Sequence, residues 1–387
     1  MNPLDRKIKS PSLQLSDFIT NNLATYNELR NFDYGSDNHT NVSCLSRYLS
    51  HRVITEYEVI NRLIAECPGK SSEKFIQEIL WRIYWRGWLE KRPKVWTDYI
   101  ETSSKQVQSS DYLRAIRGNT EINAFNDWVH ELKEFNYLHN HTRMWFASIW
   151  IFTLGLPWQL GASFFLKHLL DGDSASNTLS WRWVAGIQTK GKNYIARKSN
   201  IEKYSKKSIT DGQLNESAQA LIETYEYNMT DLPSRPNTWN KNKILLIFDN
   251  EYNQNNSNIN FFSYEKIFLL LLNNERRQVH IDPKVLEFKH NLQLAFHQKL
   301  RNSEIISQNS FEEICKDTQE IDVLYPFIGE NYDYLNRLKR TKNTKFNFIY
   351  NNQDIYCWKF SNKGYFNFKK NSPDILSYIS DKGKNDV

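Results

Sequence analysis

Several side chains that can do chemistry lie within one short segment, LDGDSASNTLSWRW, from Leu170 to Trp183. Asp171 and Asp173 are two residues apart, and further along two tryptophans stand on either side of an arginine. A buried carboxylate needs a cation beside it, because an isolated buried charge carries a large desolvation cost. Indoles stack well on other planar rings. The segment therefore indicates a polar site beside aromatic groups. The simpler alternative is that the two acids mark a solvated helix end.

The composition is that of a large globular chain rich in aromatic residues. The chain has 387 residues, 40% of them hydrophobic, and contains 12 Trp, 21 Tyr and 22 Phe. This length is enough for about two or three domains and a sizeable core. So many indoles predict either a large helical core or a function that uses indole rings. The formal net charge of +6 would help a polyanion approach, but it does not by itself indicate a nucleic-acid partner.

The cysteines and the apolar segments argue against several classes of protein. The four cysteines lie far apart without a CxxC pair, which disfavours a metal site or a disulfide framework and fits a reducing compartment. The N-terminus has no apolar segment of signal-peptide length. The run WFASIWIFTLGLPW, interrupted by Gly155 and Pro157, is too short to span a bilayer. We therefore expect a cytoplasmic protein with no bound metal and no membrane partner.

The first half of the chain is expected to be helical. Apolar residues recur at three- and four-residue spacing in EVINRLIAEC, EKFIQEILWRIYWRGWLEK and NDWVHELKEF, which is typical of amphipathic helices. Two further helices are predicted from His141 to Leu154 and over SFFLKHLLDG, where Gly172 ends the second. Around residues 205–240 the composition shifts to Ser, Lys, Asn and Pro, as expected of a linker.

Beyond residue 240 the pattern becomes that of an α/β unit. KILLIFDN, IDVLYPFI, FNFIY and IYCWKF are short apolar runs typical of buried strands, and VLEFKHNLQLAFHQKL is typical of an amphipathic helix. Alternating strands and helices favour a small α/β domain. The predicted fold is therefore mainly α, with a helical domain over residues 1–210, a linker over 211–240 and a smaller α/β domain over 241–387.

Four separated motifs of the helical half resemble those of the FAD-binding domain of the photolyase/cryptochrome family, in the family's order. VSCLSRYL (42–49) is similar to the phosphate-binding TSxLSpyL, and FIQEILWRIYW (75–85) is similar to ElxWRefy. HNHTRM (139–144) resembles HNRxRM, and DGDSASNTLSWRWVAG (171–186) resembles DGDxAsNxxxWqWxaG. The likeness runs from about Tyr34 to Ser205. It implies a photolyase-type helical domain with FAD as cofactor.

The order of the two parts differs from that of the family, in which an α/β antenna domain comes first. Here the flavin-type part comes first and the α/β part second. The chain is either a circularly permuted member or one that lost the antenna domain and gained another, and the sequence leaves both alternatives open. No motif identifies an antenna chromophore, so its presence and identity stay unknown.

The resemblance implies how FAD would be held. Ser43 and Ser46 would cradle the pyrophosphate at a helix start, although capping that helix is the alternative. Val42 and Arg52 stand where the family has threonine and glycine, which affects the local loop. Arg143 would pair with Asp171 beside the isoalloxazine ring, and the amide of Asn177 would face flavin N5 and tune its redox form. The cofactor-binding residues implied are Tyr34, Ser43, Leu45, Ser46, Arg82, Arg143, Asp171, Asp173 and Asn177.

Three tryptophans align with the family's chain of indoles that carries an electron from the surface to a photoexcited flavin. Trp181, Trp158 and Trp96 are the counterparts, from the inner to the outer position. For any single tryptophan, core packing is the alternative. Together with Glu78 and Asn177, these three indoles are the catalytic residues that the resemblance implies.

The substrate side of the family's site also has counterparts. Trp81 and Trp183 align with the indoles that sandwich a flipped-out pyrimidine dimer, and Glu78 aligns with the acid that hydrogen-bonds the dimer. Asn140 and Met144 stand where repair of (6-4) photoproducts usually relies on histidines, so they match the cyclobutane-dimer type.

Three residues around these motifs are less easily assigned to the site. His141 replaces the arginine of HNR, which weakens a phosphate or lesion contact, and Asn126 replaces an aspartate that the family commonly has. His139, which starts the motif, is open to the alternative of a buried, hydrogen-bonded core histidine.

Two functions follow from the resemblance. The first is light-driven repair of cyclobutane pyrimidine dimers in UV-damaged DNA by electron transfer from reduced FAD, with lysines such as Lys203, Lys206 and Lys207 as candidates for phosphate contacts. The alternative is a cryptochrome-type photoreceptor, in which FAD is photoreduced without repair and a signalling partner reads the change. A third possibility, a flavoprotein without a light function, does not explain the three aligned indoles.

Overall fold

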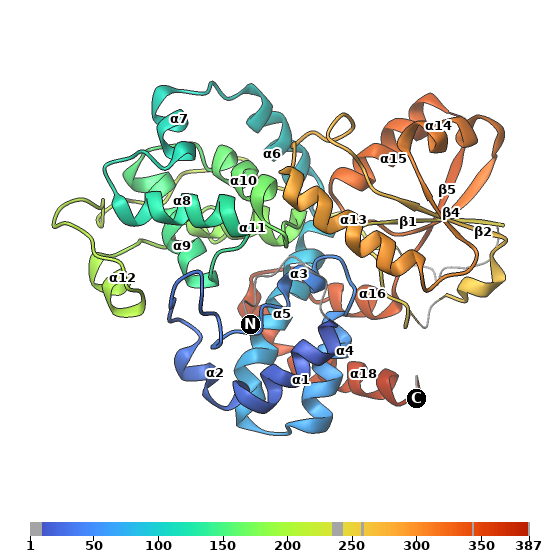
Figure 1. Cartoon of the computed structure of the whole chain (residues 1–387), viewed down its shortest axis with the longest axis horizontal. Coiled ribbons are helices and arrows are strands. Elements are labelled where there is room, and N and C mark those ends of the chain that lie inside the picture. The colour runs from blue at the N-terminus through green and yellow to red at the C-terminus, as the bar shows by residue number, and fades with distance from the viewer. Residues whose placement is uncertain (1–9, 234–242, 257–258, 343, 386–387) are drawn as a thin grey trace.

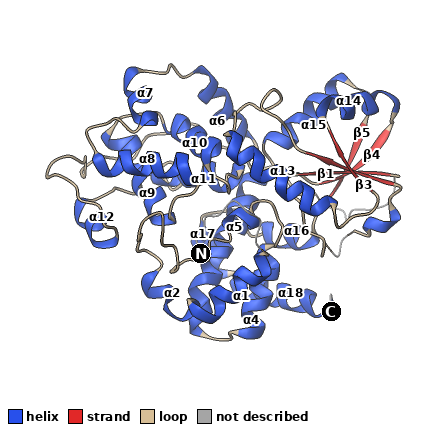
Figure 2. Cartoon of the chain, in the orientation of Figure 1, coloured by secondary structure: helices blue, strands red, loops and turns tan. Residues whose placement is uncertain are grey.

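The computed structural model describes residues 10–233, 243–256, 259–342 and 344–385 of the chain. Figure 1 shows a helical part beside a parallel sheet that has helices of its own, with the last helices of the chain returning to the helical part. Figure 2 shows that the strands are confined to one end of the molecule. The prediction of a mainly α chain with a smaller α/β part is confirmed.

The helices before the sheet follow the apolar periodicity of the sequence. The helices expected over EVINRLIAEC, EKFIQEILWRIYWRGWLEK and NDWVHELKEF are confirmed as α4, α5 and α8, and Thr55 and Glu58 form a capping box at the start of α4. The helix expected from residue 141 to 154 is α9 extended by a π-helical turn. The bounds are α1 (Pro11–Asn21), α2 (Leu23–Leu29), α3 (Ser46–Leu49), α4 (Glu56–Glu66), α5 (Lys70–Glu90), α6 (Lys94–Lys105), α7 (Ser110–Arg117), α8 (Asn123–Phe135), α9 (Asn140–Ser148), the π-helical turn (Ile149–Thr153), α10 (Trp158–His168), α11 (Ser174–Val184) and α12 (Lys198–Tyr204).

The sheet is parallel throughout, with the strand order β3-β2-β1-β4-β5. Because the order reverses beside β1, the sheet is doubly wound, with helices on both faces. The strands expected over KILLIFDN, IDVLYPFI and FNFIY are confirmed as β1, β4 and β5, and the helix over VLEFKHNLQLAFHQKL is confirmed as α13. The bounds are β1 (Ile244–Phe248), β2 (Lys266–Leu270), α13 (Pro283–His297), β3 (Ser303–Ile306), α14 (Gln308–Asp317), β4 (Glu320–Leu324), α15 (Glu330–Thr341) and β5 (Lys345–Ile349), with a short 3-10 turn (Phe261–Ser263) between β1 and β2.

Successive residues of β1 point to opposite faces of the sheet. Leu245 and Ile247 belong to the main core that includes residues of α13 and of the helical part, whereas Leu246 and Phe248 belong to a separate cluster with residues of α14 and α15. This alternation follows from the two-residue period of a strand. The sheet therefore shares one of its two cores with the helical part.

The strand predicted over IYCWKF is wrong, because this segment is helical. It forms α16 (Asn352–Trp358), which starts where the Asn351 side chain accepts a hydrogen bond from the amide of Gln353. Asp354, Cys357 and Trp358 are its buried residues, and their spacing of three and four is that of a helix. Two further helices, α17 (Tyr365–Lys370) and α18 (Ser372–Asn385), complete the chain in the described part.

The helices after β5 pack against α4 and α5 rather than against the sheet alone. A Cβ at Gly87 of α5 would lie 2.6 Å from the indole of Trp358, so α16 approaches α5 closely at this glycine. The hydroxyl of Tyr84 donates to the carbonyl oxygen of Lys363 at 2.9 Å. The described residues 211–233 of the expected linker form no helix or strand, and its residues 234–240 lie outside the described residues. The domain boundaries stay a prediction.

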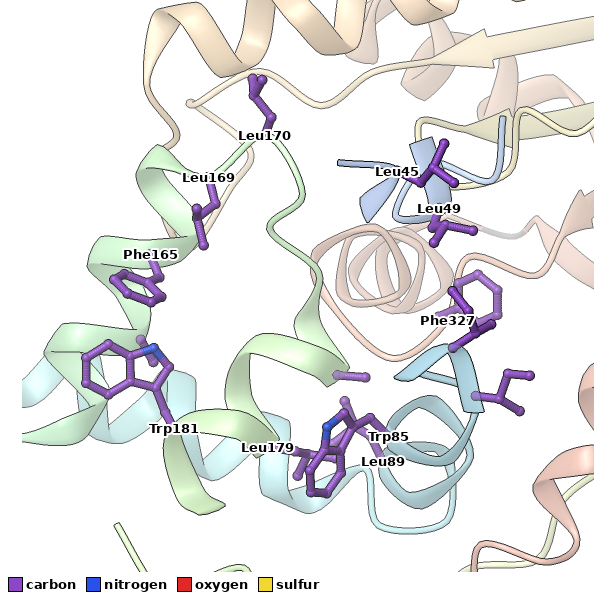
Figure 3. Packing of buried hydrophobic residues seen from close by; sticks show 14 of the residues in the cluster. Leu45, Leu49, Trp85, Leu89, Phe165, Leu169, Leu170, Leu179, Trp181 and Phe327 are labelled. Carbon is purple, nitrogen blue, oxygen red and sulfur yellow. The ribbon is translucent and has the colours of Figure 1, made fainter. Parts of the chain in front are cut away.

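One large apolar core joins the elements that carry the candidate site. Figure 3 shows side chains of α3, α5, α10 and α11 around a shared interior, together with one from the loop that follows β4. No helix of the described residues is long and apolar enough to cross a membrane. The core residues labelled in Figure 3 are Leu45, Leu49, Trp85, Leu89, Phe165, Leu169, Leu170, Leu179, Trp181 and Phe327.

Candidate functional site

Arg143 and Asp171 form an ion pair between α9 and the loop before α11, in which the carboxylate is buried and the guanidinium is partly exposed. Nη1 of Arg143 lies 3.1 and 3.0 Å from the two carboxylate oxygens of Asp171. The Ser46 hydroxyl adds a hydrogen bond to the same carboxylate. Burial acts to raise the pKa of Asp171, but Arg143 and Ser46 hold it below its usual range, so the carboxylate is charged. The predicted pairing of Asp171 with Arg143 is confirmed.

Asp173 and Arg82 fix the start of α11 against α5. Oδ1 of Asp173 accepts a hydrogen bond from the amide of Ser176 at 2.9 Å and so caps the helix. Its other oxygen lies 2.9 Å from Nη2 of Arg82, and Arg82 also contacts buried Glu56 at 3.3 Å. Arg82 and Asp173 thus hold each other in place, and the cap sets the position of every side chain on α11.

Asn177 lies one turn into α11 and is buried. Its Nδ2 donates to the backbone oxygen of Ala162 in α10 at 2.9 Å. This bond orients the amide and leaves the side-chain oxygen as the group available to a ligand. Asn177 therefore sits on the same capped helix as Trp181, with its orientation fixed by α10.

The segment predicted to cradle a pyrophosphate is tightly folded. α3 is a single turn of four residues, so its dipole is small and the expected anion site rests on the loop before it. Arg52, at the family's glycine position, has φ +48°, the left-handed conformation that glycine adopts most readily, so the turn is retained despite the substitution. Ser43 is half-buried, and its Oγ lies 3.4 Å from the amide of Leu45, which is fully buried. Tyr34 is half-buried and stacks on Phe32.

Two buried histidines beside Arg143 provide polar atoms for a bound group. The rings of His39 and His139 lie 6.5 Å apart and nearly parallel. Both ring nitrogens of His39 and Nε2 of His139 have no hydrogen-bond partner in the described part of the chain. Burial lowers the pKa of His139 to about 4 and also lowers that of His39, so both rings are neutral at neutral pH. Orphaned polar atoms of this kind fit a polar cofactor, and His39, a single histidine in a loop, gave no signal in the sequence.

The three tryptophans that align with the family's electron-carrying indoles lie on three adjacent helices. The ring of Trp158 in α10 stacks on Tyr99 at 5.6 Å, and Tyr99 lies 5.4 Å from Trp96 in α6. Trp181 of α11 packs on α10 at Gly161, where an added Cβ would lie 2.3 Å from the indole. The structure thus joins Trp96 to Trp158 through Tyr99 and places Trp181 against the helix that carries Trp158.

The resemblance implies that Trp96, the outer indole, lies at the surface, but the structure buries it. Trp96 is only 1% exposed, and a residue of α15 in the α/β part contacts its indole. Its Nε1 donates to Oδ2 of Asp333 at 2.8 Å. The surface position expected for Trp96 is therefore wrong, and the cause is the contact between the helical part and the sheet part.

Glu78 and Trp81 lie one turn apart on α5 and remain partly accessible. The Glu78 side chain is 33% exposed and contacts Lys74 at 3.2 Å and Arg30 at 3.9 Å. The indole of Trp81 stacks on Tyr365 of α17, with 3.5 Å between ring centroids and 11° between planes. One face of Trp81 is thus stacked on Tyr365, and Trp85 of the same helix also contacts the indole, with 5.0 Å between ring centroids.

Contacts around His141 link the remaining substrate-side residues. Its Nδ1 lies 2.9 Å from the backbone oxygen of Asn31, and its Nε2 lies 3.2 Å from the hydroxyl of Tyr194. The Tyr194 ring stacks on Trp183 at 5.8 Å. The neighbours of His141 on α9 are exposed Asn140 and, one turn on, half-buried Met144. His141 therefore has a structural role in place of the charged contact that an arginine would make.

Two other positions noted in the sequence are also explained by local structure. Asn126 closes the turn before α8, because its side chain accepts from the amide of Thr120 and donates to the carbonyl oxygen of the same residue. Nδ1 of His139 accepts from the amide of His141 and caps α9. No group of three or more metal-ligating side chains occurs among the described residues.

The comparisons with known proteins agree with this arrangement. Residues 75–217 match a family model described as the FAD binding domain of DNA photolyase. The deoxyribodipyrimidine photo-lyase of Streptomyces griseus is 33% identical over 38% of this chain and 32% of its own length. That of Escherichia coli is 26% identical over 48% of this chain and 41% of its own length. The cryptochrome DASH of Idiomarina loihiensis is 26% identical over 52% of this chain and 45% of its own length.

The chain spans less than half the length of each of these curated relatives, and the match to the family model falls in the helical part. That part holds the Arg143–Asp171 pair, the capped helix α11 and the aligned indoles. Residues 75–217 therefore match the FAD binding domain of DNA photolyase, and over this helical part the chain is similar to members of the photolyase/cryptochrome family.

Proposed function

We propose that this protein binds FAD and uses light-driven electron transfer to repair cyclobutane pyrimidine dimers in UV-damaged DNA. FAD, when bound, would supply the electron that opens the dimer. The Arg143–Asp171 pair, Ser46, Asn177 and the two neutral histidines would hold it, in keeping with their polarity and burial. The residues of this chain would position the dimer and exclude water.

One observation carries the proposal: a chain of contacts links the residues expected to hold the lesion. Glu78 contacts Arg30, and the backbone oxygen of the next residue, Asn31, accepts a hydrogen bond from Nδ1 of His141. His141 reaches Trp183 through Tyr194. This chain brings α5, α9 and α11 together at one side of the helical part. A carboxyl group and two partly accessible indoles on such a surface suit an extruded pyrimidine dimer, because aromatic faces recover part of the cost of unstacking.

Two of the lysines expected to contact DNA phosphates already have partners within the chain. Of the lysines expected to contribute, Lys207 is paired with Asp127 at 2.7 Å, and Lys203 lies over the ring of Tyr204. Phosphate binding would have to compete with the ion pair of Lys207. Binding to DNA should weaken as salt rises, as it does wherever phosphate contacts release counterions.

A photoreceptor is the second candidate, and the Trp81–Tyr365 stack favours it. If the face covered by Tyr365 is the one that a dimer needs, the lesion pocket is closed and only photoreduction remains. The relay indoles are retained under either function, so they do not separate the two.

The test uses the full chain, purified in the dark, loaded with FAD and reduced. Illumination with an oligonucleotide that carries one cyclobutane dimer should restore the two pyrimidines, whereas a (6-4) lesion should stay unrepaired. Glu78→Gln should reduce repair at least tenfold, and Glu73→Gln, an exposed position on the same helix, should not. Photoreduction of FAD without repair of either lesion would replace this proposal by the photoreceptor.

A further inference from the structure

The contact between Trp96 and Asp333 joins an indole of the relay to a carboxyl group of the α/β part. Trp96 lies on α6, Asp333 lies on α15, and the indole N–H points at Oδ2 over 2.8 Å. Trp96 is 1% exposed, so bulk water does not compete for this N–H. By contrast, the indole N–H of Trp181 has no hydrogen-bond partner among the described residues. Of these two relay indoles, only Trp96 has a base within hydrogen-bond distance.

The charges beside the relay differ between its middle and its outer end. The guanidinium of Arg182 lies 5.9 Å from the Trp158 ring, although its charge is partly balanced by Glu223 at 2.6 Å. A cation near an indole disfavours its oxidised form, and a carboxylate near an indole favours it. The electrostatics therefore favour movement of the positive charge from Trp158 to Trp96, through or past Tyr99.

We propose that Asp333 is the proton acceptor that ends the electron relay. This inference rests on the proposed electron-transfer function, with a photoexcited oxidised flavin as the initial oxidant. In the final step Trp96 gives one electron to the oxidised Trp158, and its Nε1–H proton passes to Oδ2 of Asp333. The products are neutral Trp158, a neutral Trp96 radical and a protonated Asp333, so electrons and protons balance. The electron cannot return to Trp96 quickly, because the proton must return with it.

The surroundings of Asp333 allow the group to act as a base near neutral pH. Burial and the nearby carboxylate of Glu330 raise the pKa of Asp333 to about 6, while the hydrogen bond from Trp96 and the charge of Arg337 act to lower it. Glu330 is itself fixed by the amides of Gln278 and Val279. Above this pKa the carboxyl group is charged and free to take a proton, and its affinity for that proton exceeds that of an ordinary aspartate.

The experiment compares the FAD-loaded full chain with its Asp333→Asn variant, in which the amide oxygen can still accept the hydrogen bond but cannot take the proton. After a laser flash, the wild-type protein should form the neutral indole radical, and the variant should retain the radical cation at least ten times longer. A wild-type and variant that deprotonate at the same rate would overturn the inference and leave the proposed function intact. The absence of any indole radical in the wild-type protein would also overturn the inference, whereas the repair assay with FAD reduced beforehand tests the proposed function separately.

A second readout needs neither light nor flavin. The ¹⁵N–¹H signal of the Trp96 indole should shift with a midpoint near pH 6 in the wild-type protein, following Asp333, and should not shift in Asp333→Asn. The signal of Trp181 is the internal control, since no carboxyl group bonds its N–H. A Trp96 signal that is independent of pH between 4 and 8 in the wild-type protein would also overturn the inference.

Discussion

Arg52 and Asp354 form a fully buried bidentate ion pair, although 302 positions separate them in the chain. Nη1 and Nη2 of Arg52 lie 2.7 and 2.6 Å from the two carboxylate oxygens of Asp354. Glu251, in the loop after β1, lies 3.0 Å from Nη1 of the same guanidinium. A single side chain thus joins the turn after α3, the sheet part and α16. It stands at the position where the resemblance places a glycine, and it makes a connection that a glycine could not make.

The first prediction concerns the stability of this connection. Asp354→Asn leaves the buried Arg52 with less compensating charge, and breaking a buried pair in this way costs about 3 kcal/mol of unfolding free energy. Chemical denaturation with fluorescence detection measures the loss. Asp374→Asn, at an exposed position in the first turn of α18, should change the free energy by less than about 1 kcal/mol. Equal losses in the two variants would mean that the pair contributes little.

The second prediction concerns retention of FAD. Asp171→Asn removes the charge that balances Arg143 and weakens the hydrogen bond from Ser46, so the polar wall of the site loses its fixed geometry. We expect the flavin content after dark purification to fall at least tenfold, as read from absorbance near 450 nm against protein. Asp127→Asn, whose carboxylate pairs with Lys207 at the surface, is the matched control and should keep its flavin. If the Asp171→Asn variant kept its full flavin content, the cofactor would have to bind elsewhere.

The third prediction is a pH dependence of stability that arises from Glu90. Burial raises the pKa of Glu90 from 4.5 to about 7, although Tyr325 and the amide of Ile328 donate hydrogen bonds to it. Between pH 4.5 and 7 the folded state binds the proton and the unfolded state has lost it, so stability falls as pH rises through this window.

Glu90→Gln removes this dependence. The variant should match the wild-type protein at pH 4.5 and be more stable by about 1 to 2 kcal/mol at pH 8, as measured by urea denaturation at both pH values. Glu101→Gln, at an exposed position on α6, should have the same stability as the wild-type protein at both pH values. A gain that is the same at pH 4.5 and pH 8 would show that packing, and not proton binding, is responsible.

The fold could be predicted from the sequence wherever one face of an element is apolar and the other polar. α4, α5 and α13 follow this rule, and β1 is a short buried run. β2 was not predicted, because a continuous apolar run such as that around KIFLL fits a buried helix as well as a strand. β3 is a four-residue edge strand with a mixed pattern, so it carries little periodicity.

The candidate site could be predicted only through motifs, and its supporting contacts could not. The Arg143–Asp171 pair follows from two motifs that the family resemblance aligns. The contact of Trp96 with Asp333 depends on how the sheet part packs on α6, which no local pattern encodes. The same holds for Tyr365, whose ring reaches Trp81 from a helix 284 positions later in the chain. Long-range packing of this kind follows from the whole fold and not from segment propensities.

The fourth prediction uses the Trp81–Tyr365 stack to separate the two proposed functions. If Tyr365 stacks on the face of Trp81 that does not bind the lesion, it holds the indole in place, and Tyr365→Ala leaves the indole mobile. Affinity for an oligonucleotide with a cyclobutane dimer should then fall several-fold. Tyr365→Phe, which keeps the ring and loses only the hydrogen bond to the Gln77 carbonyl, should bind nearly as well as the wild-type protein.

Fluorescence anisotropy with lesion and intact oligonucleotides, at two salt concentrations, measures these affinities. The expected result is a loss confined to the lesion oligonucleotide, because intact DNA does not enter the pocket. A gain of lesion binding in Tyr365→Ala would have the opposite meaning: Tyr365 would then occupy the face that a base needs. The native protein would be closed to lesions, and the photoreceptor would become the better account of its function.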